Sequence, residues 1–429
     1  MKGILAGILF LFTTVAFSQQ KYNLIQNYLE RKGEEWLDLY RYLHQNPELS
    51  REETNTASLL RQKISSLGYR VIDSLGYQSF AAVLENGEGP VILYRTDMDA
   101  LPIKEETGLQ YSSTRIYEKE GAKIPAMHAC GHDIHMSVWM GLAAFMAESK
   151  KHWKGTIVFL AQSAEETGQG AKTVVSSPNF QKLPQPNIQI AIHSQPDLEI
   201  GTFGLCDGYS MAAVDMMKVT IFGKGGHGAA PEKTIDPIVM SARFVSEIQT
   251  IVSRNLSSKE PAVITVGAIH GGTAGNIIPD KVELKLTIRS FSEESRKKIL
   301  DRIKAIGDGI ALSAGMNKDQ LPIYDLGDMS IPAVFNDKPL GDRIERILRT
   351  EYGYSAISKS DPVMIGEDFG VYRKSFPTSE SYLMWAGVSF NKTADRPGLH
   401  NSKFAPDYDR AILKSIRMIS TLLLEMMKK

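Results

Sequence analysis

The sequence has few cysteines and no surplus of either charge. Its two cysteines, Cys130 and Cys206, allow one internal disulfide at most. Its 49 basic residues balance 49 acidic ones, and no basic block stands out. This balance gives no support for a nucleic-acid partner or for electrostatic attachment to a membrane. The chain also lacks internal repeats and low-complexity segments.

A long hydrophobic run is found at the start of the chain, from Ile4 to Phe17, and it follows Lys2. The run is too short for a flanked helix to cross a bilayer core of about 30 Å. Ala16 and Ser18 are the small residues that a signal peptidase reads. We therefore predict that residues 1–18 are a signal peptide and that the mature protein is exported, to the periplasm or outside the cell. No stable membrane association is expected after cleavage, and an uncleaved anchor is the alternative.

With 429 residues, of which 43% are hydrophobic, the chain is an ordinary globular one and long enough for two domains. Apolar residues recur at helical spacing in two segments near the start of the mature chain, and another helix is expected further on. Short continuous apolar runs, bounded by polar residues, Gly or Pro, are typical of buried parallel strands. The expected helices are 22–45, 54–67 and 134–148, and the expected strands contain 91–94, 157–160 and 188–192. This part of the chain is predicted to be α/β with a mainly parallel central sheet.

The pattern changes near Met211, where apolar and polar residues begin to alternate. Alternation is typical of strands with one face in water. The expected order is strand, helix, strand, strand, helix, strand, which indicates an inserted ferredoxin-like (split βαβ) layer. We predict a catalytic domain in two parts, residues 19–210 and 326–429, around an insertion at 211–325. The chain is expected to close with an amphipathic helix over 408–427.

The segment Met127–Met136, MHACGHDIHM, crowds thiolate, imidazole and carboxylate groups together. These groups bind divalent transition metals, although the spacing fits no zinc-finger pattern. A polar loop with helix-capping histidines is the alternative. In that case Cys130 would be half of a Cys130–Cys206 disulfide, a pairing that export would permit.

Ligand-type side chains also follow three of the predicted strands. Glu165 and Glu166 come just after one strand, His193 ends a second, and Asp97 and Asp99 end a third. In open α/β sheets, sites are built at this carboxyl edge. Because adjacent side chains do not easily point the same way, one glutamate can bind a metal while the other faces the substrate as general acid or base.

Eight ordered motifs carry a resemblance to a known family over nearly the whole chain after residue 18. They are RTDMDALP, MHACGHDIHM, AEE, AIHSQP, GGHGAAPEKTIDPI, GGTAGNIIPD, GEDF and LHNSKF. Their order resembles that of the amidohydrolase and carboxypeptidase metalloenzymes typified by hippurate hydrolases and plant auxin-amino-acid conjugate hydrolases. The resemblance implies an aminoacylase-type hydrolase that acts on C–N amide bonds.

The resemblance also implies a site with two divalent metal ions per chain, which could be Zn, Mn, Co or Ni. The implied ligands are Cys130, His132, Glu166, His193 and His400, with Cys130 as the bridge. Glu165 takes the place of the catalytic carboxylate.

Three more residues match the family on the inserted segment. His227 corresponds to a catalytic histidine that often reaches the active site of the partner subunit, and Asn276 and Arg289 correspond to residues that hold the substrate carboxylate. The resemblance further implies a homodimer formed through the inserted domain. One departure is Arg95, which stands where related peptidases have a metal-binding histidine. Because arginine cannot bind a metal, Asp97 and with it Asp99 are expected only to support the metal ligands.

The expected reaction is hydrolysis of an N-acyl or N-aroyl amino acid to a carboxylic acid and a free amino acid. In this reaction, metal-activated water attacks the carbonyl group and Glu165 acts as general base and acid. The alternatives are an exported dipeptidase or carboxypeptidase that acts on short peptides, and a non-catalytic protein of the same fold that binds small molecules.

Overall fold

The computed structural model describes residues 2–327, 329–390 and 396–428, with side chains from residue 21 onward. The chain divides into two compact units. The larger unit comprises residues 1–208, 335–361 and 371–429, and the smaller one comprises residues 209–334 and 362–370. The sequence placed the insertion at 211–325, whereas the smaller unit continues to residue 334 and takes in a separate second segment.

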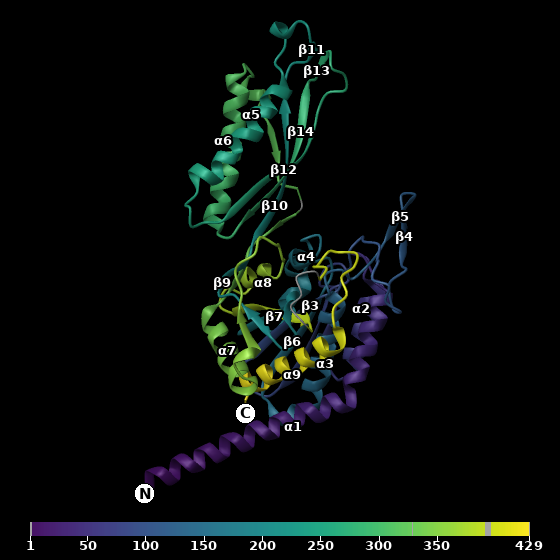
Figure 1. Ribbon diagram of the computed structural model, residues 1–429, viewed down its shortest axis with the longest axis vertical. Coiled ribbons are helices and arrows are strands. Elements are labelled where there is room, and N and C mark those ends of the chain that lie inside the picture. The colour runs from purple at the N-terminus through teal and green to yellow at the C-terminus, as the bar shows by residue number, and fades with distance from the viewer. Residues whose placement is uncertain (1, 328, 391–395, 429) are drawn as a thin grey trace. The chain divides into compact units, whose positions relative to one another are not determined.

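An eight-stranded sheet forms the core of the larger unit (Figure 1). Across the sheet, its strands are β1 (Arg70–Ile72), β2 (Phe80–Asn86), β6 (Gly155–Gln162), β3 (Val91–Asp97), β7 (Ile188–Glu199), β19 (Glu380–Ser389), β8 (Phe203–Leu205) and β18 (Ile357–Lys359). β3 is parallel to both β6 and β7, and β19 is parallel to β7. Antiparallel pairs join β2 to β6 and β8 to β19. The predicted α/β fold with a mainly parallel central sheet is confirmed.

The three predicted strands are longer than their apolar runs. β3 ends at Asp97, as predicted, and β6 ends at Gln162, so that Glu165 and Glu166 follow the strand as expected. β7 continues to Glu199 because it stays paired with β19 to that point. His193 therefore lies within a strand and not at its end.

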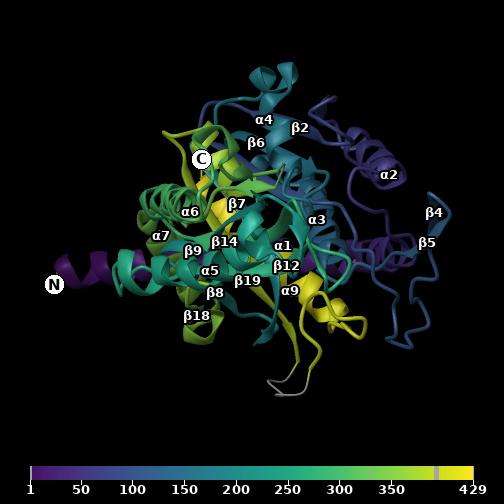
Figure 2. The same cartoon turned by 90° about the horizontal axis from the view of Figure 1, so that it is seen from above.

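Three helices of the larger unit, α1 (Lys2–Gln45), α3 (His132–Glu148) and α9 (Tyr408–Met426), pack against one another (Figures 1 and 2). α3 contacts β3 and β7, and α9 contacts β19. Residues 132–146 of α3 are all buried, as expected for a helix that is covered on every side. The helix begins at His132, two residues earlier than the sequence indicated, so a predicted metal ligand is its first residue.

The other elements are short or peripheral. The hairpin of β4 (Ile116–Lys119) and β5 (Ala122–Pro125) lies at the periphery of the larger unit in both views (Figures 1 and 2). Further elements outside the two main sheets include α2 (Thr54–Ser66), α4 (Gly170–Ser176), β9 (Gly208–Met211), β17 (Val334–Asn336), α7 (Lys338–Tyr352) and α8 (Gly370–Ser375).

The smaller unit has the split βαβ order that the alternating pattern predicted. In chain order it contains β10 (Ala213–Phe222), α5 (Pro237–Thr250), β12 (Ala262–His270), β14 (Lys281–Ser290), α6 (Glu293–Ser313) and β15 (Ile323–Asp325). The sheet order is β12-β14-β10-β15, all pairs are antiparallel, and β16 (Ser330–Ile331) also pairs with β10. Asp236 and Ser292 cap the two helices by accepting backbone N–H groups, as these residue types do at helix starts. Dimerisation through this unit stays a prediction.

At the amino terminus, α1 starts at Lys2 and includes the segment that we predict to be a signal peptide. Lys21 forms ion pairs with Glu351 at 2.6 Å and Glu425 at 2.5 Å. Within the described parts of the chain, no helix is both long and apolar enough to cross a membrane. Cleavage and export stay predictions, which amino-terminal sequencing of the protein from its native host would test.

Candidate metal centre and active site

The predicted metal ligands of the larger unit come from four separate places in the chain. Cys130 and His132 flank Gly131, which is the N-cap of α3. Glu166 lies in the turn after β6, His193 lies in β7, and His400 lies in the segment before α9. Gly131 has φ of +80°, and a Cβ there would lie 2.8 Å from the Ser194 hydroxyl oxygen, so glycine is needed where α3 approaches β7.

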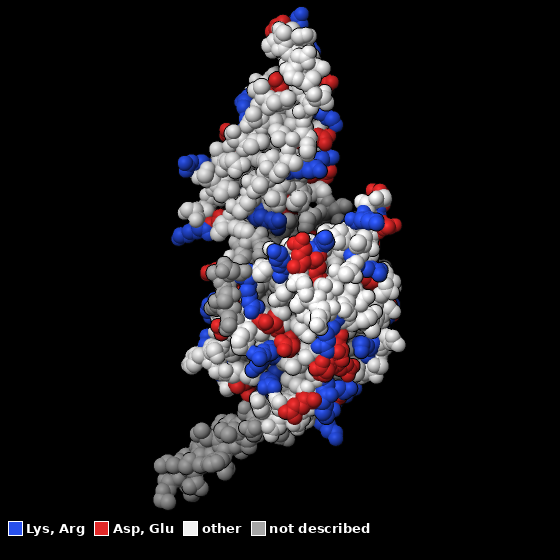
Figure 3. Space-filling view, turned by 45° about the vertical axis from the view of Figure 1, so that its right-hand side comes forward, with Lys and Arg blue, Asp and Glu red and all other residues white. Residues whose placement is uncertain are grey.

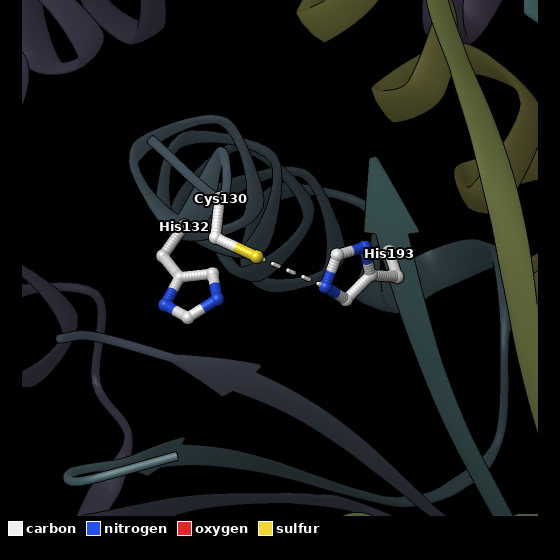
Figure 4. Close-up of side chains that lie close together, drawn as sticks. All are labelled: Cys130, His132 and His193. Atoms are coloured by element: carbon white, nitrogen blue, oxygen red, sulfur yellow. Dashed lines mark hydrogen bonds between the residues drawn. The ribbon is translucent and has the colours of Figure 1, made fainter. Parts of the chain in front are cut away.

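The Cys130 sulfur takes part in two groups of potential ligands. In the first, Cys130, His132 and His193 place one ligand atom each within 4.8 Å of the others (Figure 4). The Cys130 sulfur lies 3.5 Å from His193 Nε2. In the second group, the sulfur lies 3.2 Å from His400 Nε2, which is 3.5 Å from a Glu166 oxygen. A shared sulfur is the arrangement that a bridging cysteine requires.

Two ligand atoms of this site make no hydrogen bond to the described residues, which is the condition that a bound cation would relieve. His132 Nε2 and Glu166 Oε1 are buried, make no hydrogen bond and lie 3.8 Å apart. Burial, reinforced by the charges of Glu166 and Glu165, raises the pKa of the Cys130 thiol well above its usual value. Burial also raises the pKa of Glu166 to about 8. Such nitrogen, oxygen and sulfur donors fit divalent transition metals, because a metal satisfies orphaned lone pairs and takes the thiol as thiolate.

Asp97 and Asp99 lie beside these ligands. The Asp99 backbone oxygen lies 2.8 Å from His132 Nδ1, and its carboxylate accepts the Glu166 N–H at 2.9 Å. Asp97 lies 2.7 Å from His135 Nδ1 and also 2.7 Å from the Arg95 guanidinium. The Asp99 contacts orient His132 and the backbone of Glu166, whereas Asp97 contacts residues beside the predicted ligands. The supporting role of both aspartates stays a prediction.

His135, which the motif contains but the predicted ligand set does not, connects α3 to β7. Its Nε2 accepts the Ser194 N–H at 2.9 Å, so the neutral ring carries its proton on Nδ1 and donates it to Asp97. His135 and Asp97 also form a buried cluster with His132. His135 therefore ties the start of α3 to the strand that carries His193.

Asp133, from the same motif, contacts a different set of side chains. Its carboxylate lies 2.7 Å from His44 Nδ1, and His44 Nε2 lies 3.1 Å from Glu105. Burial alone would lower the pKa of His44, but the hydrogen bonds to Asp133 and Glu105 raise it to about 9. This network connects α1 to the start of α3, and no pattern in the sequence indicates it.

A second group that sequence reasoning missed surrounds the two adjacent glutamates. Glu53 is fully buried, and its carboxylate accepts the Ala164 N–H at 2.8 Å and contacts the Ser163 hydroxyl. Burial and the charge of Asp99 raise the pKa of Glu53 to about 7, against the effect of the hydrogen bonds. In the sequence, Glu53 stands next to Glu52 before a helix, where a solvated carboxylate is the ordinary expectation.

His227, Asn276 and Arg289 all belong to the smaller unit. His227 is exposed in the short ribbon of β11 (Gly226–His227) and β13 (Ile277–Ile278), and the next residue, Gly228, donates its N–H to the Asn276 carbonyl. Arg289 lies on β14, is half-buried and has no hydrogen-bond or ion-pair partner among the described residues. The roles of these three residues stay predictions.

The alternative of a disulfide is wrong in this structure, since Cys130 and Cys206 are both buried and neither forms a disulfide. Cys206 follows β8, and the carbonyl group of Cys206 accepts a hydrogen bond from Asn336 at 2.9 Å. Cys130 is thus available as a ligand.

Comparisons with known proteins agree with this geometry. Residues 93–425 match Peptidase family M20/M25/M40. An N-acetyl-L-cysteine deacetylase of Bacillus subtilis (strain 168) is 35% identical over 81% of this chain and 79% of its own length. An N-acetyldiaminopimelate deacetylase of Geobacillus sp. (strain WCH70) is 36% identical over 86% of this chain and 92% of its own.

Among solved structures, the chain is similar to a Bacillus subtilis protein described as a dinuclear metal-binding peptidase of the M20 family. The TM-score is 0.76 and the identity 26%, over 93% of this chain and 99% of that one. The predicted family resemblance is confirmed. By its sequence and its fold, the chain belongs to peptidase family M20/M25/M40 and is a hydrolase of amide bonds.

Proposed function

We propose that the enzyme removes the acyl group from N-acyl amino acids, with small groups such as acetyl as the first candidates. The observation that carries the proposal is the pair of ligand groups that share the Cys130 sulfur, with a Glu165 oxygen within 4.8 Å of ligand atoms of His132 and Glu166. The substrates named for the curated relatives, N-acetylcysteine and N-acetyldiaminopimelate, support N-acyl amino acids over short peptides. The alternative of a non-catalytic binding protein does not agree with membership in a hydrolase family.

In the proposed reaction, the metal would be held by Cys130, His132, Glu166, His193 and His400. Bound there, divalent cations would supply Lewis acidity that polarises the carbonyl group and acidifies water. The Glu165 carboxylate removes a proton from the attacking water, holds it on one oxygen and gives it to the nitrogen of the departing amino acid. Glu165 is only 7% exposed, so this proton is kept away from bulk solvent.

The test is metal analysis of the purified protein together with a hydrolysis assay on N-acetyl amino acids, N-benzoyl amino acids and dipeptides. We expect about two divalent ions per chain and release of free amino acid that stops on chelation and returns when metal is restored. The N-acetyl substrates should be hydrolysed fastest. Turnover of dipeptides alone would favour the peptidase alternative, and turnover that survives complete chelation would contradict the proposed mechanism.

We further propose that Arg289 binds the substrate carboxylate. Its half-buried guanidinium lacks a partner among the described residues, and burial lowers its pKa, so an anion would be favourable there. Arg289→Gln should raise KM for N-acetyl amino acids by about 10- to 100-fold, the usual strength of a charged hydrogen bond. KM for the matching N-acetyl amino acid amides, which lack the carboxylate, should not change.

Lys285→Gln is the matched control, since Lys285 is an exposed cation on the same strand. Its KM should stay at the wild-type value for both kinds of substrate. If Arg289→Gln raised KM equally for the acid and the amide substrates, Arg289 would not bind the substrate carboxylate.

A further inference from the structure

The turn between β6 and α4 carries both adjacent glutamates and has an unusual backbone conformation. Ala164, the residue before Glu165, has φ of +58°, in the left-handed region that favours glycine. Alanine is disfavoured there because its Cβ crowds the backbone. Ala164 is also buried, so the surrounding structure has to hold this conformation.

Glu53 is the side chain that contacts the turn at this point. Although Glu53 is the N-cap of α2, its side chain makes no capping hydrogen bond to that helix. Instead, one carboxylate oxygen accepts the Ala164 N–H at 2.8 Å and the other contacts the Ser163 hydroxyl. A fully buried carboxylate is costly, and here its hydrogen bonds are made to the turn and not to its own helix.

The neighbouring amides of the turn are held by side chains as well. Ser79 Oγ accepts the Ser163 N–H at 2.9 Å, and Asp99 accepts the Glu166 N–H at 2.9 Å. The Asp99 carboxylate also accepts the hydroxyl of Ser50 at 2.6 Å, and Ser50 belongs to the same segment as Glu53. Side chains outside the turn therefore accept three of its N–H groups, those of Ser163, Ala164 and Glu166, and Glu53 binds the N–H of the left-handed residue.

We propose that Glu53 is a positioning residue: it holds Ala164 in the left-handed conformation and so sets where the Glu165 carboxylate lies. This inference rests on the proposed function, because it concerns the placement of the group that moves the proton. Within the described part of the chain, the Glu53 carboxylate makes its hydrogen bonds to Ser163 and Ala164 and none to a predicted metal ligand.

The central comparison is between Glu53→Met and Glu53→Gln, which have similar volumes. Glutamine keeps one oxygen that can accept the Ala164 N–H, whereas methionine has no acceptor. Glu53→Met should lower kcat by about 10- to 100-fold with KM and metal content unchanged, as expected when a catalytic group is misplaced by a fraction of an ångström. The fall in kcat should be smaller in Glu53→Gln than in Glu53→Met. Glu52→Met, at a neighbouring glutamate whose side chain is 33% exposed, is the control and should match wild type.

A rescue separates positioning from a general structural defect. Glycine adopts positive φ without a Cβ penalty, so adding Ala164→Gly to Glu53→Met should restore most of the lost kcat. A second readout needs no turnover: amide hydrogen exchange at Ala164 in the metal-free protein should be fastest in Glu53→Met and intermediate in Glu53→Gln. If Glu53→Met does not fold, the exchange rate and kcat of Glu53→Gln against wild type still test the contact.

Wild-type kcat in Glu53→Met, or an Ala164 exchange rate that is unchanged in both variants, would overturn the inference. A loss of kcat that Ala164→Gly does not restore would also overturn it. Failure of the proposed function is distinguishable, because the wild-type enzyme would then not hydrolyse N-acyl amino acids, while the exchange measurement would still report on Glu53.

Discussion

Replacing Glu165 by glutamine is expected to lower kcat by about 10²- to 10⁴-fold, the range found when a general acid or base is removed. Glutamine has nearly the same size and keeps the fold of the turn, but it cannot accept a proton from water. Metal content should stay at the wild-type value, because Glu165 is outside the predicted ligand set and glutamine keeps an oxygen at the position that lies within 4.8 Å of ligand atoms of His132 and Glu166. The measurement is kcat and KM at saturating metal, with metal analysis of the same sample.

The matched control is Glu52→Gln, since the Glu52 side chain is 33% exposed and pairs with Lys119 at the surface. It should be indistinguishable from wild type. If Glu165→Gln also kept a kcat close to the wild-type value, another group would have to move the proton.

The second large effect is expected on stability, from Arg95→Met. The Arg95 and Asp97 side chains are completely buried and lie 2.7 Å apart, and Arg95 also donates to Gln162 at 3.0 Å. Removing one member of a buried ion pair leaves an uncompensated charge and typically costs about 3–5 kcal/mol. We therefore expect the free energy of unfolding, measured by urea denaturation of metal-free protein, to fall by that amount.

Two further variants test whether the loss of stability comes from the buried ion pair or would follow from replacing any arginine on these strands. Arg70→Met removes an arginine on β1 that is 55% exposed and lies 3.7 Å from Glu85, so its cost should be at most about 1 kcal/mol. Arg95→Met with Asp97→Asn should be more stable than Arg95→Met alone, because no buried charge is left without a partner. If Arg95→Met and Arg70→Met lowered the free energy of unfolding equally, the buried ion pair would matter no more to stability than a surface contact.

Arg95 also illustrates which features of this site could be predicted from the sequence. The motif showed that Arg95 replaces a metal-binding histidine, but its partners Asp97 and Gln162 depend on the register between β3 and β6. Three candidate ligands within motifs, Cys130, His132 and Glu166, could be proposed from the sequence because metal chemistry restricts the residue types, and the structure brings their side chains together. A lone residue such as His400 required the family resemblance, since nothing local separates it from an ordinary loop histidine.

Residues that act through tertiary contacts could not be predicted from the sequence. Glu53 precedes a helix and reads as a solvated glutamate, and its burial follows only from the folded position of the β6–α4 turn. In the same way, β2 and β19 were not assigned, because short apolar runs do not distinguish a strand from a buried helix. The helices and the split βαβ unit were predictable, because periodicity and capping residues are local.

The position of β19 in the sheet has a consequence for biosynthesis. This strand comes from residues 380–389, yet it lies between β7 and β8, which precede it by well over one hundred residues. Cys130 and its neighbour His400 are likewise 270 positions apart. A ribosome must therefore translate nearly the whole message before the sheet can close and the last ligand can join the others. Products of premature termination would expose an unpaired edge of β7, a surface that promotes aggregation, and would lack part of the metal centre.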